Sequence, residues 1–182
     1  MAEKQRTLKS SISFQGKGLH TGVEVELTIH PAPTNHGYVF KRIDLPGQPN
    51  INAFAENVTD TSRGTTLEEN GARVSTVEHV LSALAGMRLD NAIIDITGPE
   101  TPILDGSAKA YVEAIEEAGI VEQNAERRYF KITEKLEYYD ENNGVHIIAY
   151  PDKMQSINVL IDYNSDYLGN QYATLEQWEN YK

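Results

Sequence analysis

A strict alternation of apolar and polar side chains over residues 23–30 constrains the fold of this chain more than any other feature. The apolar members are Val23, Val25, Leu27 and Ile29, and the polar ones are Glu24, Glu26, Thr28 and His30. Successive side chains of a strand point to opposite faces, so the pattern predicts a strand with one buried and one solvated face. A similar alternation over 7–14 and a Gly-rich stretch at 16–22 precede it, and together they predict a β-hairpin.

Two further strands and two helices are expected in the first part of the chain. The segments 38–43 and 91–97 are typical of strands, and the second is apolar enough to be buried. Apolar residues recur at helical spacing over 76–85, and 108–118 shows a second amphipathic pattern with Gly119 placed as its C-terminal cap. Two helices and several hairpin-linked strands predict an α+β fold, a two-layer sandwich of a mixed sheet and two helices.

The order of elements then begins again, which predicts an internal duplication. We expect a first α+β domain over 1–122, a polar linker over 123–128 and the first strands of a duplicated second domain over 129–182. In the second copy, two alternating segments flank a turn at 140–144, as in the first hairpin. The pattern for two helices does not follow, so we expect this second domain to be incomplete and poorly protected from hydrogen exchange.

Charge and residue types exclude several classes of function. Sixteen lysines and arginines stand against 27 acidic residues, a formal charge of −11, which argues against a nucleic-acid partner because the phosphate backbone would be repelled. There is no cysteine, so a metal ion would need histidines and carboxylates. No apolar run reaches the roughly 20 residues of a transmembrane helix, and no signal-peptide pattern opens the chain, so we expect a cytoplasmic protein.

The segment 75–86 carries the most informative combination of residues, and two interpretations of it are open. Ser75 followed three residues later by Glu78 is typical of a capping box, in which Glu78 only stabilises the start of the helix. His79 lies almost opposite the apolar stripe, so it is not a core histidine. The residues on its own face are small, namely Ser82, Ala83 and Gly86. A carboxylate beside an imidazole on a face of small side chains is also compatible with a metal site, although adjacency alone is a weak signal.

Four short motifs resemble those of one enzyme family. They are 75–79 with 83–86 and 90–91, then 18–22, 31–33 and 99–107. Their order and spacing are similar too, and the resemblance covers essentially the whole chain. The chain resembles the N-terminal portion of the zinc-dependent UDP-3-O-acyl-N-acetylglucosamine deacetylases, hydrolases that catalyse the committed step of lipid A biosynthesis.

The resemblance implies two similar α+β domains with the active site at their junction. It implies that His79 is a zinc ligand and that Glu78 is the general base for hydrolysis of the substrate's acetamide. The family's other ligands, a His and an Asp, and a further catalytic His belong to the second domain, and none of these motifs is present here. We therefore expect UDP-3-O-acyl-N-acetylglucosamine to be the substrate of the full-length protein and this chain alone to be inactive.

Two further residues are weaker candidates with open roles. His20 in the Gly-rich turn either lines a substrate cleft or is an ordinary loop residue. Asp105 either helps to position the site across the domain junction or, with Ser107, shapes the turn that caps the second helix.

Two other functions stand as alternatives to a deacetylase. One is a non-enzymatic binding module whose acidic surface meets a basic partner, and the other is a zinc hydrolase half-site completed by another chain. A downstream helix with the missing His and Asp would favour the deacetylase, whereas a separate chain that carries them would favour the half-site.

Overall fold

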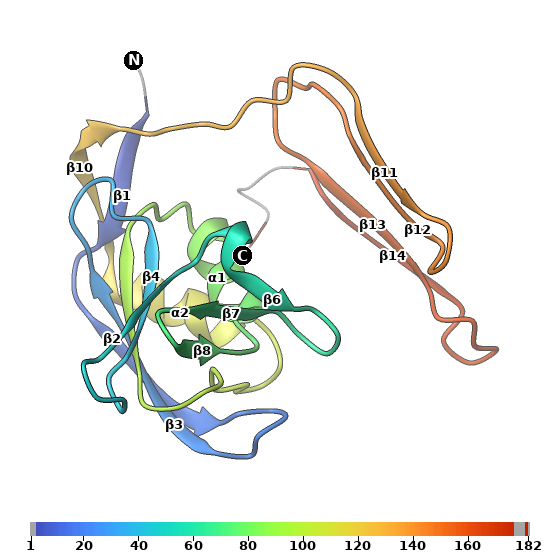
Figure 1. Cartoon of the computed structure of the whole chain (residues 1–182). Helices are drawn as coiled ribbons and strands as arrows, with labels where there is room; N and C mark the ends of the chain where they lie inside the picture. The colour runs from blue at the N-terminus through green and yellow to red at the C-terminus, as the bar shows by residue number, and fades with distance from the viewer. Residues whose placement is uncertain (1–2, 177–180, 182) are drawn as a thin grey trace. The chain divides into compact units, whose positions relative to one another are not determined.

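The chain folds as two units that differ in how much of their apolar surface is buried. A computed structural model describes residues 3–176 and 181, and Figure 1 shows their elements in chain order. The two compact units are Met1–Arg127 and Arg128–Tyr181. Within the described residues, every buried apolar side chain belongs to the first unit.

A mixed five-stranded sheet forms the centre of the first unit. Its strands lie in the order β2 (Ile12–Lys17), β3 (Glu24–Pro31), β9 (Ala92–Ile96), β4 (Tyr38–Arg42) and β5 (Asn50–Asn52). β4 and β9 pair in parallel, and the other neighbours pair antiparallel. The predicted hairpin is confirmed for β2 and β3. The alternation over 7–14, however, is divided between β2 and a separate strand, β1 (Lys4–Leu8), which pairs outside this sheet.

The alternation on β3 sets which face of the sheet is buried. Val25, Leu27 and Ile29 are 4, 0 and 0% exposed, whereas Glu26 between them is exposed. Val23 precedes the strand and is itself exposed, so the buried face begins at Val25. Each fully buried aliphatic side chain contributes about 1.5–3 kcal/mol. A slip of one residue in the pairing would move all three into water, so the pairing of this strand is strongly specified.

Two helices lie beside each other next to the sheet (Figure 1), α1 over Glu78–Gly86 and α2 over Lys109–Ala118. Their buried residues include Val80, Ala83 and Leu84 in α1 and Tyr111, Val112 and Ile115 in α2. The centroid of the Tyr111 ring lies 4.7 Å from that of Phe14 on β2, which packs α2 against the sheet. Gly119 ends α2 with a φ of 80°, as expected of a C-terminal glycine. The predicted α+β class, with a mixed sheet and two helices, is therefore confirmed.

A second, three-stranded sheet is absent from the sequence predictions. It consists of β6 (Val58–Asp60), β7 (Thr66–Glu69) and β8 (Ala72–Val74), and a short 3-10 helix, η1 (Ala55–Asn57), precedes it. Asn70 and Gly71 form the turn between β7 and β8, and both have a positive φ. Asn-Gly is the strongest short hairpin signal. Strands of three or four residues are nevertheless too short for their alternation to be recognised.

The last strand of the first unit lies where the sequence predicts a linker. β10 (Ile120–Glu126) pairs antiparallel with β1. The structure thus differs from the expected linker over 123–128, because a strand extends as far as Glu126.

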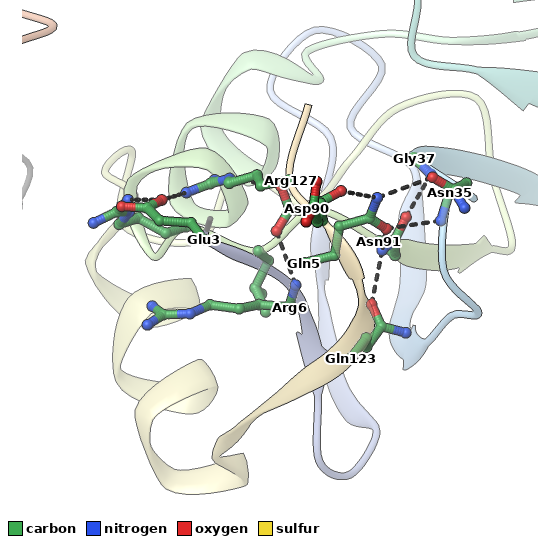
Figure 2. A network of polar contacts seen from close by, with 12 residues as sticks. Glu3, Gln5, Arg6, Asn35, Gly37, Asp90, Asn91, Gln123 and Arg127 are labelled. Atoms are coloured by element: carbon green, nitrogen blue, oxygen red, sulfur yellow. Dashed lines mark hydrogen bonds and ion pairs between the residues drawn. The ribbon is translucent and has the colours of Figure 1, made fainter. Parts of the chain in front are cut away.

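A network of polar side chains explains why this strand is polar (Figure 2). Asn91 is buried, and its Nδ2 donates to Gln5 Oε1 at 2.9 Å and to Gln123 Oε1 at 2.8 Å. Its Oδ1 accepts the backbone N–H of Gly37 at 2.9 Å. Buried polar atoms need such partners, so the polar side chain of Gln123 provides a hydrogen bond to the buried Asn91, at a point where the pairing of β10 with β1 shifts register.

Asp90 anchors the end of the first unit (Figure 2). Its carboxylate accepts the backbone N–H of Arg6 and the Nε–H of Arg127, both at 2.8 Å. Arg127 also lies 3.6 Å from the carboxylate of Glu3. The chain is therefore held by side-chain contacts up to the last residue of this unit.

The second unit consists of two separate β-hairpins. The first pairs β11 (Leu136–Asp140) with β12 (Val145–Ala149), and the second pairs β13 (Ile157–Asp162) with β14 (Asn170–Leu175). Large apolar side chains on both hairpins are exposed, among them Tyr138, Ile147, Leu160 and Tyr172. No described residue of this unit is buried, so the described part of it has no core of its own.

Candidate functional site

Glu78 and His79 occupy the first turn of α1, where both side chains reach solvent. The Glu78 side chain is 40% exposed and the His79 side chain 28%. Glu78 Oε1 lies 4.0 Å from His79 Nε2. The positive end of the helix dipole favours a carboxylate at this position. The structure thus presents the two principal sequence candidates together on an open side of the helix.

The capping-box interpretation of Glu78 is wrong. The residue before α1 is Val77, and no side chain caps this helix. Ser75 lies two residues further back, where its hydroxyl bonds a strand of the three-stranded sheet. Glu78 Oε2 instead accepts the backbone N–H of Thr65 at 2.9 Å. The spacing fits a capping box, but Thr76 adopts a left-handed φ of 59°, which removes Ser75 from the capping position.

The loop 61–65 lies between Glu78 and His20. Glu78 bonds the last residue of this loop, and His20 Nε2 donates to the carbonyl oxygen of Arg63 at 2.9 Å. Gly64 separates these two contacts. A Cβ on Gly64 would lie 3.1 Å from Glu78 Oε1, and its φ of 153° also favours glycine. The structure therefore brings His20, a weaker candidate, to the same loop as Glu78.

A cavity of about 170 Å³ lies beside this loop. The residues that line it include His20, Arg63, Arg73, Thr76 and Glu100. Glu78 and His79 lie outside its lining. Drug-sized ligands occupy pockets of about 300–1,000 Å³, so this cavity is too small to enclose a nucleotide sugar. The Glu78–His79 pair is partly exposed and is not enclosed by this cavity.

Asp105 shapes the turn before α2. Its Oδ1 accepts the backbone N–H and the hydroxyl of Ser107, both at 2.9 Å. These bonds hold the pKa of Asp105 below its ordinary value. Ser107 Oγ in turn accepts the N–H of Lys109, the first residue of α2. This is the arrangement expected if Asp105 serves the turn.

Glu100 is a residue beside the site that the sequence analysis does not single out. It is fully buried, and its carboxylate accepts the backbone N–H groups of His20 and Thr21 and the hydroxyl of Thr76. Burial acts to raise the pKa of Glu100, but these hydrogen bonds outweigh it and hold the pKa below its ordinary value of 4.5. The one signal in the sequence was its place in the motif 99–107.

The donors at the site fit a zinc ion in kind but not in number. An imidazole and a carboxylate are both ordinary zinc ligands, and His79 and Glu78 supply one of each. A catalytic zinc takes about three protein ligands. Across residues 3–176 and 181, no group of three or more His, Cys, Asp or Glu side chains is placed to hold a metal ion. A metal site here would need ligands beyond this pair.

The helices of the described chain give no sign of a membrane span, since none combines the length and apolar character that crossing requires. Fold and site together define an α+β domain that exposes a carboxylate–imidazole pair at the start of a helix. The model of the family described as UDP-3-O-acyl N-acetylglycosamine deacetylase matches residues 5–182. The chain belongs to this family, and the resemblance seen in its four motifs is confirmed.

Curated relatives agree with this assignment. The bifunctional enzyme LpxC/FabZ of Bacteroides thetaiotaomicron is 53% identical over 179 residues, which cover 98% of this chain and 39% of that enzyme. The UDP-3-O-acyl-N-acetylglucosamine deacetylase of Saccharophagus degradans is 46% identical over 88% of this chain and 53% of the relative. That of Legionella pneumophila is 44% identical over 94% of this chain and 56% of the relative. The chain thus spans roughly two fifths to a little over half of their lengths.

Proposed function

We propose that this chain is the part of a UDP-3-O-acyl-N-acetylglucosamine deacetylase that supplies the general base and one zinc ligand. The reaction is hydrolysis of the acetamide of an acylated UDP-sugar, the committed step of lipid A biosynthesis. The observation that carries the proposal is the partly exposed Glu78–His79 pair at the start of α1, in a chain that belongs to the family.

Glu78 is suited to act as the base because its two oxygens have different surroundings. Oε2 accepts the N–H of Thr65, which fixes the carboxylate in place. Oε1 faces His79 Nε2 at 4.0 Å. This oxygen is left to take a proton from a water molecule held beside it, as a general base requires.

His79 is the residue of this chain that would hold the metal, through its imidazole. When bound, zinc lowers the pKa of a coordinated water to about 7 and polarises the amide carbonyl. Because one imidazole is too few for a catalytic zinc site, the remaining ligands must come from residues outside this pair. We assign them to a second α+β domain.

The order of hairpins supports such a duplication. In the first unit the hairpin β2–β3 is followed by the hairpin β4–β5, and in the second unit β11–β12 is followed by β13–β14. The exposed apolar side chains of the second unit would then pack under helices equivalent to α1 and α2.

A chimera tests the proposal, with this chain in place of the matching 179 residues of the Bacteroides thetaiotaomicron enzyme. The chimera should release acetate from UDP-3-O-acyl-N-acetylglucosamine. Glu78→Gln should lower kcat by about 10²–10⁴-fold, the usual effect of losing a general base. Glu117→Gln, an exposed carboxylate on α2, is the matched control and should leave kcat unchanged.

Two results would contradict the proposal. One is a folded, zinc-loaded chimera that does not turn over, and the other is full activity in Glu78→Gln. Activity of this chain by itself would instead show that the remaining zinc ligands lie within the chain. Activity restored by mixing this chain with a separate second domain would favour completion by another chain.

A further inference from the structure

The start of α1 follows an unusual backbone conformation at Thr76. Thr76 has a φ of 59°, in the left-handed region that is unfavourable for a β-branched residue. It is also buried, with 1% of its surface exposed. Such a conformation persists only where the surrounding structure holds it, and it is often found next to functional groups.

The segment 99–101 holds Thr76 through both its side chain and its backbone. Glu100 Oε1 accepts the Thr76 hydroxyl at 2.8 Å, and Thr101 Oγ1 donates to the Thr76 carbonyl oxygen at 2.6 Å. The neighbouring Ser75 adds two backbone hydrogen bonds to the same segment, at 2.9 and 3.1 Å. These hydrogen bonds therefore fix both the side chain and the backbone of Thr76.

The same carboxylate also holds the hairpin loop 18–22. It accepts the backbone N–H of His20 at 3.0 Å and that of Thr21 at 2.8 Å. Gly18 allows this close approach, because a Cβ there would lie 2.4 Å from Glu100 Oε2. Glu100 thus joins the loop that carries His20 to the turn that leads into α1.

The carboxylate of Glu100 accepts more hydrogen bonds than a neutral side chain of the same shape could. Within the described residues its bonded partners are backbone N–H groups and hydroxyls, and it belongs to no ion pair. Several donors converge on two oxygens, which a carboxylate satisfies and an amide does not, because an amide has one oxygen. A neutral glutamine of the same shape would leave some of these donors without an acceptor.

We propose that Glu100 is a positioning residue for the Glu78 base. It holds Thr76 in the left-handed conformation, which sets where α1 begins and so directs Glu78 toward the loop 61–65. This role rests on the proposed function, since Glu78 is the base only if the chain belongs to a working deacetylase. The effect of Glu100 on the position of Glu78, transmitted through Thr76, can be measured without catalytic turnover.

Amide hydrogen exchange, followed by NMR on this chain, tests the step. In Glu100→Gln, exchange of the Thr65 N–H that bonds Glu78 should speed up about tenfold more than exchange at Ile94, the equivalent of one lost hydrogen bond. Ile94 lies on the core strand β9 and reports global stability. Glu117→Gln, exposed on α2, is the matched control and should change neither rate.

A second substitution separates positioning from simple loss of stability. Glycine adopts a left-handed φ without strain, so Thr76→Gly added to Glu100→Gln should restore slow exchange at Thr65. The N–H groups of His20 and Thr21 should stay fast, because the carboxylate that accepts them is still absent.

Two results would overturn the proposal: unchanged Thr65 exchange in Glu100→Gln, or no recovery in the double variant. The exchange rates do not depend on catalysis. An inactive wild-type chimera would therefore overturn the proposed function, whereas the structural coupling of Glu100 to Glu78 through Thr76 is tested by the exchange rates alone.

Discussion

The two units of this chain have similar strand patterns and opposite burial. Ile94 on β9 is fully buried, whereas Ile161 on β13 is 44% exposed. Both lie on strands that have an antiparallel neighbour. The difference is a covering layer, because the first unit has two helices beside its sheet and the described part of the second has strands alone. Local pattern is enough to form a hairpin, but a core needs a second layer.

The candidate site belongs to the unit that has a core. Glu78 and His79 stand on α1, whose inner side is buried through residues such as Val80 and Leu84. The buried carboxylate of Glu100 fixes the turn before the same helix. The first unit therefore holds the two candidate side chains on a packed framework.

Hydrogen exchange should show the largest contrast between the units. Amides of β3 should exchange at least about 10³-fold more slowly than amides of β11–β14, because core strands open only by global unfolding while isolated hairpins are marginally stable. Mass spectrometry of peptides from each unit measures the ratio. Protection of the second unit equal to that of β3 would show that it has a stable core after all.

Ile→Ala substitutions at one position in each unit test the difference in burial directly. Ile94→Ala should destabilise the first unit by about 2–5 kcal/mol, the usual cost of such a cavity. Ile161→Ala should cost less than about 0.5 kcal/mol, because its side chain is already exposed to water. Urea denaturation followed by circular dichroism measures both. Equal losses of stability in the two variants would contradict the difference in burial between the units.

Acid should weaken the first unit through Glu100. Its pKa in the folded state lies below the ordinary 4.5, so the stabilisation is complete above that pH and is lost as the pH falls through the folded pKa. At pH 7, Glu100→Gln should lower the free energy of unfolding by about 1–3 kcal/mol. The difference in this free energy between the variant and wild type should become smaller as the pH falls.

A control for Glu100 comes from the second unit. Hydrogen bonds from Lys135 and His146 also lower the pKa of Glu137, but this carboxylate lies in solvent, where such pairs contribute little. Glu137→Gln should therefore leave the denaturation curve unchanged at every pH. If the difference in unfolding free energy between Glu100→Gln and wild type stayed constant with pH, the negative charge of Glu100 would not be what stabilises the first unit.

Alanine substitutions at two glycines should give the smallest difference in stability between the units. Gly119 has φ and ψ of 80° and 159° at the end of α2, a region open to glycine alone. Gly119→Ala should lower the stability of the first unit by about 1 kcal/mol. Gly144, with a φ of 63° in the turn between β11 and β12, is the matched position. Gly144→Ala should leave the melting of the first unit unchanged, and a loss there would show that the units fold together.

The strands with long alternating patterns were predictable, and short or polar ones were not. The buried face of β3 follows directly from the spacing of Val25, Leu27 and Ile29. The polar strand β10 was not predicted, because Gln123 bonds the buried side chain of Asn91, a partner 32 residues away. Its polarity has a tertiary cause that no local pattern contains.

The pair Glu78 and His79 could be proposed from the sequence, but the contacts that hold it in place could not. Glu78 and His79 were proposed as site residues from the motif at 75–86. The capping interpretation of Ser75 failed because the left-handed backbone of Thr76 leaves no local signal. Glu100 was missed for a related reason, since its partners come from segments about 80 and 24 residues away.

Zinc titration into this chain by calorimetry tests most directly whether the site of the first unit needs ligands from elsewhere. We expect weak or no binding, with the same result in His79→Ala, because the described residues bring no three ligands together. Tight one-to-one binding that is lost in His79→Ala would contradict this. It would show that further ligands lie within the chain, with His20 the first to test.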